Sequence, residues 1–325
     1  MRRGVSDGLR CMHAMRRAST LTSRKRLEAL VRHVGVETLT DGSRTFVGGS
    51  HDLGWGRIYG GQTMAQAVAA CQAVVAPRVL HQFSCNFLAG GDVSQDVTFE
   101  TDVLTSGRSF SVVHVRALQD RGPILSMTAS FQSAEEGLEH QSANGIDPRW
   151  RSPDELSSLE EHMAPWLIER VPQRMHQLYT DSPFDIRPTT FVAPWDATPH
   201  EPSRAYWMRA RDPATLPDDT AVHQRLLTYL SDWGLLETAI LPHPTAMWRP
   251  EMQVASLSHT MHFHHQFRFD ERWLLHVMRS PSASGGRGYA LGEVYREDGL
   301  LVASTAQEGL MRHHASVESR QAKSA

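Results

Sequence analysis

A stretch without any charged residue runs from Ile58 to Pro77 and reads IYGGQTMAQAVAACQAVVAP. It is rich in alanine, begins after glycines and ends at a proline, which predicts a helix of about 14–16 residues. Because no face of this helix is polar, we expect it to be buried on all sides.

Four segments with strand-like patterns follow this helix, and turn signals such as Gly90-Gly91 separate them. A polar, acidic stretch typical of a linker comes next, and then a similar order of elements returns. A central helix followed by antiparallel strands predicts an α+β fold. The expected strands cover residues 79–88, 96–107, 109–120 and 123–132, then 184–194 and 203–212, and, after a helix at 221–240, residues 255–267, 273–284, 288–298 and 299–311.

Two of these strands can be overlaid without a gap. GPILSMTASFQ, which begins at Gly122, matches GLLVASTAQEG, which begins at Gly299, at an offset of 177 residues. Placing Phe87 on Phe263 aligns two earlier strands at an offset of 176. The shared order of elements predicts that the chain contains one α+β unit twice.

The composition of the 325-residue chain narrows its possible functions. With 33 basic and 36 acidic residues, the net charge of −3 gives no general case for binding nucleic acid. No apolar run approaches the roughly 18 residues of a membrane span. The three cysteines form neither a disulfide framework nor a CxxC site, so a reducing compartment is the simplest interpretation.

The first 26 residues hold seven Arg and one Lys against a single acidic residue, Asp7. This composition is typical of a mitochondrial transit peptide; the alternatives are a disordered tail or a true start at Met12 or Met15. The chain ends in RQAKSA, which is not the S-K-L peroxisomal signal. We therefore expect a mitochondrial or cytoplasmic protein, with the peroxisomal matrix as the alternative.

The repeat provides an internal control, because a residue that serves only the fold should have a similar counterpart in the other copy. Asp232 lies among apolar neighbours in the second helix, where a carboxylate is at least partly desolvated, and the first helix has no acid. Gln307 is matched by Ser130, and Ser256 by Leu80. The plain alternative is a solvent-facing Asp and two ordinary hydrogen-bonded strand residues. Three unmatched polar residues in one copy nevertheless favour a site.

Other candidates are weaker. In HTMHFHHQF, strand alternation would put His262 and His264 on one face, but no nearby Cys or acid completes a metal site, so we expect none. The Gly-rich segment before the first helix fits neither GxGxxG nor the Walker pattern. Its end, Gly60-Gly61-Gln62, is a candidate substrate-binding segment, because free N–H groups at a helix start can meet an oxyanion.

Taken over longer segments, the chain resembles the type II acyl-CoA thioesterases, a double-hotdog group with bacterial and peroxisomal members. The resemblance spans roughly residues 47–313. The catalytic Asp, Thr or Ser, and Gln of that family fall on Asp232, Ser256 and Gln307, with Ser where well-known bacterial members have Thr. The matching stretches are YGGQTMAQAVAA, FLAGGD, SFSVVHVRALQDRGPILSMTASFQ, VHQRLLTYLSD, HTMHFH and SPSASGGRGYALGEVYREDGLLVASTAQEGLMR.

The resemblance implies an α+β double hotdog, in which an antiparallel sheet wraps a long central helix in each unit. The expected division is a basic extension at 1–26, a first hotdog at 27–135, a linker at 136–182, a second hotdog at 183–315 and a polar tail at 316–325.

The implied activity is hydrolysis of fatty acyl-CoA to free acid and coenzyme A by direct attack of water, with no cofactor. Asp232 would take the proton of the water, Ser256 would share its hydrogen bonds, and Gln307 would bind water and support the oxyanion. We expect a homodimer or a higher homo-oligomer. Two alternatives remain: a hotdog hydratase or dehydratase acting on acyl-CoA, and an acyl-CoA binding protein without catalysis.

Overall fold

The computed structural model describes residues 23–40, 42–142, 146–269 and 272–314. A helix at 23–33 opens this part, so the expected extension 1–26 overlaps ordered structure, and its first 22 residues lie outside the described residues, as does the polar tail. Two short strands follow, β1 (Glu37–Thr38) and β2 (Thr45–Gly48).

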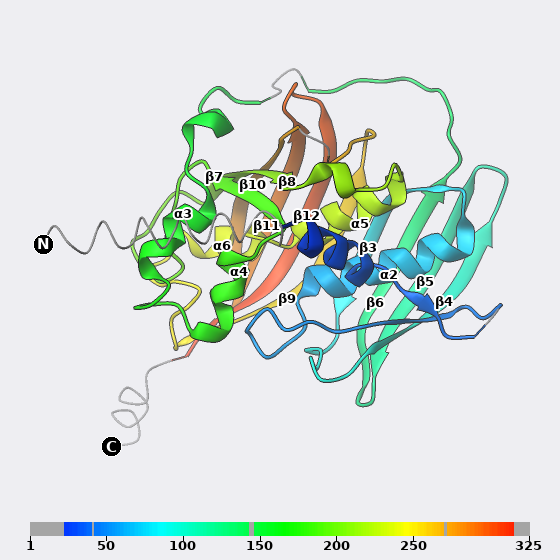
Figure 1. The fold of residues 1–325 in the computed structure, drawn as a ribbon, viewed down its shortest axis with the longest axis horizontal. Coiled ribbons are helices and arrows are strands. Elements are labelled where there is room, and N and C mark those ends of the chain that lie inside the picture. The colour runs from blue at the N-terminus through cyan, green and yellow to red at the C-terminus, as the bar shows by residue number, and fades with distance from the viewer. Residues whose placement is uncertain (1–22, 41, 143–145, 270–271, 315–325) are drawn as a thin grey trace, which may run out of the picture.

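The first long helix, α2 (Gly60–Val75), confirms the prediction from the charge-free stretch. It spans 16 residues, and all but four of them are buried, because the helix packs against the sheet on one side and against a second helix on the other. That second helix, α5 (Thr220–Ser231), runs antiparallel to α2, since Gln72 near the end of α2 donates to the carbonyl of Ala221 at the start of α5. Figure 1 shows both helices lying across the same face of the sheet.

A single twelve-stranded sheet carries both units. Its strand order is β1-β2-β4-β5-β6-β3-β9-β12-β11-β10-β8-β7, so the order in one half mirrors that in the other about the β3–β9 pair. This symmetry matches the duplication expected from the sequence. The strands not yet given are β3 (Val79–Phe87), β4 (Val97–Ser106), β5 (Phe110–Gln119), β6 (Gly122–Gln132), β7 (Phe184–Pro188), β8 (Ser203–Ala210), β9 (Met252–Phe263), β10 (Leu274–Ser284), β11 (Arg287–Arg296) and β12 (Leu301–His313).

The strand registers correct one detail of the sequence alignment. Ser84 pairs with Thr260, 176 residues later, at the joint between the units, and their hydroxyls hydrogen-bond. On the same offset Phe83 corresponds to His259, and the partners of these two residues are Ala129 and Gln307. The structural counterpart of Gln307 is therefore Ala129. The gapless overlay on Ser130 is therefore wrong by one residue. Since successive side chains of a strand face opposite sides, Ser130 points away from the face that corresponds to that of Gln307.

The expected helix at 221–240 is interrupted directly after its third turn. Helix α5 ends at Ser231, Asp232 caps it, and a short helix, α6 (Leu235–Ile240), begins after Gly234. Gly234 has φ +83°, a left-handed conformation that breaks the helix and that glycine adopts without a steric penalty. Asp232 is thus a helix-end residue and not, as the pattern suggested, an interior one.

The expected linker at 136–182 is only partly extended chain. From Pro153 onward it forms η1 (Pro153–Glu155), α3 (Leu159–Met163), η2 (Ala164–Trp166), η3 (Gln173–Met175) and α4 (His176–Thr180). A further turn, η4 (Pro213–Thr215), precedes α5. These short helices bury Met163, Val171, Met175 and Tyr179 in a small apolar cluster of their own. Isolated apolar residues in a polar stretch gave no period from which these helices could be predicted.

Candidate active site

Asp232 receives hydrogen bonds on both carboxylate oxygens. The side-chain nitrogen Nε2 of Gln307 donates to Oδ1 over 2.9 Å, and the hydroxyl of Ser256 donates to the same oxygen over 3.2 Å. The backbone N–H of Gly61 donates to Oδ2 over 3.1 Å. Gly61 lies in the first turn of α2, where N–H groups have no partner within the helix and the helix dipole favours a negative charge.

The structure brings together all three residues singled out by the repeat. Ser256 lies on β9 and Gln307 on the neighbouring β12, and Gln307 also donates from Nε2 to the Ser256 hydroxyl over 2.9 Å. Gln307 is 1% exposed, so this amide exchanges no hydrogen bonds with bulk water. Each member of the trio contacts the other two, which makes the arrangement a closed hydrogen-bonded triangle around one carboxylate oxygen.

Two further residues of the site were missed by the sequence. Nδ1 of His259 lies 2.9 Å from Oε1 of Gln307, and its Nε2 lies 3.1 Å from the hydroxyl of Ser231. Simple alternation placed His259 on the face opposite Ser256. A bulge opposite the Glu308–Gly309 step leaves Leu257 unpaired, and this extra residue returns His259 to the side of Ser256.

The bulge has a counterpart in the first unit, where His81 is left unpaired between Leu80 and Gln82. It is therefore a feature of the repeated unit and not of the site alone. In the first unit the corresponding inward positions hold Leu80 and Ala129, which are both buried and apolar. The polar trio thus has no equivalent there.

The three residues of the predicted substrate-binding segment, Gly60-Gly61-Gln62, make different contacts. A Cβ on Gly60 would lie 2.7 Å from Oδ2 of Asp232, and one on Gly61 would lie 2.2 Å from the backbone oxygen of Tyr229. Both glycines therefore allow the start of α2 to approach the end of α5. Gln62 points elsewhere: its amide nitrogen donates to the backbone oxygen of Gly49 over 3.1 Å.

Tyr59, directly before α2, adds a buried hydroxyl to this region. The residue is 7% exposed, and its hydroxyl has no hydrogen-bond partner within the part of the chain that the structure describes. Burial and, next, the nearby Asp232 raise the pKa of Tyr59 well above its usual value, so the phenol stays protonated as a donor. Its ring packs edge-on against Tyr229 with 5.0 Å between centroids.

Among the residues that the structure describes, the histidines near the end of β9 do not gather with other potential ligands. The rings of His262 and His264 are nearly parallel, with 6.5 Å between centroids, as expected for neighbours on one face. Within the described ranges, no group of three or more His, Cys, Asp or Glu side chains could hold a metal ion. His223, at the start of α5, accepts a hydrogen bond from the backbone N–H of Phe269 over 3.0 Å and does not reach Asp232.

Comparison with known proteins identifies the family. Residues 174–310 match the family model "Acyl-CoA thioesterase", and residues 50–132 match "Acyl-CoA thioesterase N-terminal domain". Acyl-CoA thioesterase 2 of Haemophilus influenzae is 35% identical over 269 residues, which cover 82% of this chain and 92% of the relative. The chain belongs to the acyl-CoA thioesterase family.

A further relative and two solved structures agree with this family assignment. Human acyl-coenzyme A thioesterase 8 is 34% identical over 79% of the chain and 81% of its own length. The crystal structure of acyl-CoA thioesterase II TesB2 from Mycobacterium marinum is 30% identical, covers 88% of this chain and 98% of that one, and has a TM-score of 0.69. A hotdog-fold protein from Alicyclobacillus acidocaldarius, 21% identical, covers 88% of this chain and 99% of its own with a TM-score of 0.67. The fold is thus the expected double hotdog.

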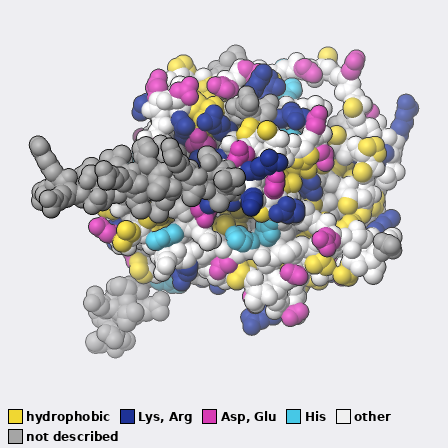
Figure 2. Space-filling view, in the orientation of Figure 1, with side chains coloured by type: hydrophobic (Ala, Val, Ile, Leu, Met, Phe, Trp, Pro, Cys, Tyr) yellow, Lys and Arg dark blue, Asp and Glu magenta, His cyan; other side chains and the backbone are white. Residues whose placement is uncertain are grey.

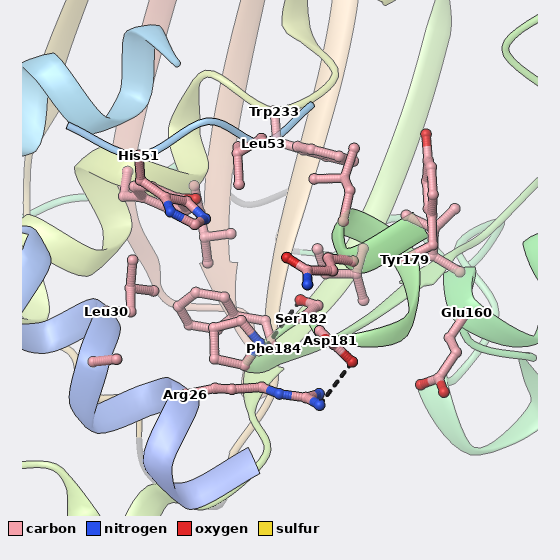
Figure 3. Close-up of a pocket in the computed structure, with 18 of the residues that line it drawn as sticks. Arg26, Leu30, His51, Leu53, Glu160, Tyr179, Asp181, Ser182, Phe184 and Trp233 are labelled. Carbon is pink, nitrogen blue, oxygen red and sulfur yellow. Dashed lines mark hydrogen bonds and ion pairs between the residues drawn. The ribbon is translucent and has the colours of Figure 1, made fainter. Parts of the chain in front are cut away.

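A cavity of about 390 Å³ lies beside the end of α5 in this thioesterase-family chain. Figure 3 shows Trp233, the neighbour of Asp232, at its upper wall together with Leu53, while Leu30 and Phe184 lie opposite. Four of the charged lining residues form two ion pairs, Arg26 with Asp181 over 2.7 Å and Arg211 with Glu160 over 3.0 Å. The lining is mainly apolar, and it comes from the helix at 23–33, the loop at 51–53, the linker helices, the first residues of β7 and the end of α5.

The outer surface shows no single dominant sign of charge on the face of Figure 2, where Lys and Arg side chains are interspersed with Asp and Glu. No helix among the described residues is long and apolar enough to cross a membrane.

Proposed function

We propose that this protein hydrolyses fatty acyl-CoA thioesters to the free acid and coenzyme A by direct attack of water, with Asp232 as the general base. The observation that carries this proposal is the carboxylate of Asp232, fixed by three donors beside the start of α2. A base held in one orientation can align a water molecule for attack, and such positioning supplies a large part of the rate of an enzyme reaction.

The proposed reaction conserves atoms and protons. The water oxygen bonds to the thioester carbonyl carbon while its proton passes to Asp232. The tetrahedral intermediate then collapses with cleavage of the C–S bond, and the proton returns from Asp232 to the departing sulfur. No covalent bond to the enzyme forms in this scheme.

The roles of the other residues follow from their bonds. Both N–H groups of Gln307 are engaged, with Asp232 and with Ser256, so we assign this amide to aligning the two and not to binding the oxyanion alone. We assign the oxyanion to the start of α2, where the backbone N–H of Gly60 lies at the positive end of the helix. Gln62 has no part in this scheme, because its side chain hydrogen-bonds the backbone of Gly49.

We further propose that the cavity beside Trp233 receives the acyl chain. Its volume falls in the range of small-molecule sites, and its lining is mainly apolar. Asp232, Ser256 and Gln307 do not line it, so the link to the proposed base is Trp233, which directly follows Asp232 in the chain.

Release of free thiol from palmitoyl-CoA, compared with addition of water to crotonyl-CoA, tests the proposal against its alternatives. A hydratase should act on crotonyl-CoA and would need a His–Asp pair, whereas neither His223 nor His259 hydrogen-bonds Asp232 in the described structure. A binding protein would do neither reaction. We expect thiol release that falls by about 10²–10⁴-fold in Asp232→Asn, because Asn keeps the size but takes no proton. A folded Asp232→Asn protein with unchanged turnover would refute the assigned role.

Assembly into a homodimer or larger oligomer, the unit limits 27–135 and 183–315, and a mitochondrial, cytoplasmic or peroxisomal location stay predictions from the sequence.

A further inference from the structure

His259 hydrogen-bonds Gln307 but neither Asp232 nor Ser256. It is fully buried, and its two ring nitrogens face Gln307 on one side and Ser231 on the other. Phe83, from the first unit, packs against its ring with 5.9 Å between centroids and an angle of 16° between the planes. The imidazole therefore has little freedom to turn.

The direction of each hydrogen bond can be worked out from donors and acceptors alone. Nε2 of Gln307 faces a carboxylate oxygen and a hydroxyl, so this end of the amide must be the nitrogen. The other end, Oε1, is an acceptor only, and it faces Nδ1 of His259. Nδ1 must then carry a proton and donate it to Gln307.

The remaining nitrogen of His259 completes the chain of bonds. Burial lowers the pKa of His259 below its usual value, although Asp232 and Gln307 act in the opposite direction. A neutral imidazole with its proton on Nδ1 has a lone pair on Nε2, which faces the hydroxyl of Ser231 over 3.1 Å. Ser231, in the last turn of α5 directly before Asp232, also donates its hydroxyl to the backbone oxygen of Thr228 over 2.8 Å, so two acceptors compete for its one proton.

We infer that His259 is a positioning residue, which holds the amide of Gln307 in the one orientation that directs its NH2 group at Asp232 and Ser256. Turned by 180°, the amide would place its oxygen against the carboxylate of Asp232 and its nitrogen against a protonated Nδ1. Donation from His259 opposes that rotation. This role rests on the proposed hydrolysis, since it acts through the residues assigned to it.

The same contacts exclude a nucleophilic role for Ser256 supported by His259. Both nitrogens of His259 face other groups, and neither hydrogen-bonds the Ser256 hydroxyl. The bulge at Leu257 brings the two residues to one face, but Gln307 lies between them.

A double-mutant cycle in the full-length protein tests the inference. His259→Phe keeps the ring but removes the donor, and we expect kcat for palmitoyl-CoA to fall by about 10- to 100-fold, with KM within a few-fold. His259→Asn places an amide nitrogen the same number of bonds from the backbone as Nδ1, so it should recover at least half of that loss on a logarithmic scale. The double variant His259→Phe/Gln307→Ala should be no slower than Gln307→Ala.

The control is His262→Phe, on the same strand but exposed on the outer face, which should keep the wild-type kcat. Losses that multiply in the double variant would show that His259 acts independently of Gln307 and would overturn the inference. An Asn variant as slow as the Phe variant would overturn it too.

A measurement without turnover separates this inference from the proposed function. In the ¹⁵N-histidine-labelled wild-type protein, NMR should find the proton of His259 on Nδ1. A proton on Nε2 would overturn the inference even in an active enzyme or if His259→Phe does not fold. Absence of thiol release with the proton on Nδ1 would refute the hydrolysis and leave the assigned orientation of Gln307 supported.

Discussion

Gly61, in the first turn of α2, donates its backbone N–H to Oδ2 of Asp232 over 3.1 Å and so joins the first unit of the chain to the second at the candidate active site. The trio of polar side chains belongs to one copy, yet the other copy supplies the end of a helix to its carboxylate. A helix N-terminus lowers the energy of a nearby negative charge by about 0.3–1 kcal/mol, and by up to about 2 kcal/mol when partly buried.

The two glycines at this contact should respond differently to an added methyl group. Gly61→Ala would press on the backbone of Tyr229, which can yield only if α2 and α5 separate, so we expect the free energy of unfolding to fall by about 1–3 kcal/mol. Gly60→Ala meets the carboxylate of Asp232 and the ring of Phe87, which can shift, so kcat should fall about tenfold or more with a smaller change in stability. Urea unfolding and steady-state kinetics of both variants give the comparison; equal effects on stability would contradict it.

Gln307→Ala should lower kcat by about 10²-fold, because Asp232 and Ser256 both lose the amide that aligns them. Ser130→Ala is a matched control from the first unit. Ser130 faces the outer side of the sheet and hydrogen-bonds His81, so its loss should leave turnover within a few-fold. Thiol release from palmitoyl-CoA measures both, and equal losses would mean that the effect at Gln307 does not come from its bonds to Asp232 and Ser256.

Ser256→Thr should remain active, because the hydroxyl that donates to Asp232 is kept. The added methyl group would cost about 1–3 kcal/mol if the surrounding side chains cannot yield. Ser256→Ala should lose more, since one acceptor site of Asp232 and one donor of Gln307 are left without a partner, at about 1–3 kcal/mol for a buried group. Mass spectrometry during turnover tests for a covalent intermediate. An acyl adduct on Ser256 would contradict direct attack by water and indicate a covalent route.

The cavity beside Trp233 makes a prediction about chain length. Ala29→Trp adds a large ring at the cavity wall from an exposed position of the helix at 23–33. If the ring displaces about two methylene groups of a long acyl chain, kcat/KM for palmitoyl-CoA should fall by about tenfold, at about 0.8 kcal/mol per methylene, while butyryl-CoA is unaffected. Arg32→Trp, on the same helix but outside the cavity, is the control. A uniform loss for both substrates would place the acyl chain elsewhere.

His276 should make stability depend on pH. It is 1% exposed, and burial, followed by the nearby His259, lowers its pKa to about 3. The unfolded chain therefore binds a proton between pH 6.5 and 3 that the folded chain rejects, so stability is lost as pH falls through this window. From pH 6.5 to 5 this group alone can remove up to about 2 kcal/mol. Urea unfolding at pH 7 and pH 5 should show a smaller loss of unfolding free energy in His276→Leu than in the wild type. An equal loss in both proteins would refute the role of His276.

The sequence was informative where side-chain chemistry alone decides the structure. The buried helix α2 followed from a run without charges, and Asp232, Ser256 and Gln307 followed from comparing the two copies. Strand register could not be predicted from the sequence. The bulge at Leu257 changes which side of β9 each later residue faces, and no residue type indicates such a bulge. His259 was therefore placed on the wrong face. Ser130 was taken as the counterpart of Gln307 for another reason: aligning Gly122 with Gly299 is one residue off the structural register of β6 and β12.

The break at Asp232 has a related cause. A helical period continues from α5 into α6, and only the conformation of Gly234 interrupts it. An isolated glycine in a helical pattern is usually tolerated, so the pattern alone favoured one long helix. The linker helices were missed because their apolar residues pack on one another and not on the main core, which leaves each helix too short for a recognisable period.

The two halves that share the continuous sheet across the β3–β9 joint belong to one chain, and this allows the two copies to differ. In a pair of identical chains, a substitution made on one side of the dyad appears on the other as well, so a polar centre at one place brings a second polar centre with it. Covalent fusion removes that coupling. One half of this chain keeps Leu80 and Ala129 as inert packing while the other carries Ser256 and Gln307. Titration with a tight-binding inhibitor should accordingly reach its end point at one equivalent per polypeptide, half the density of sites that the architecture alone would allow.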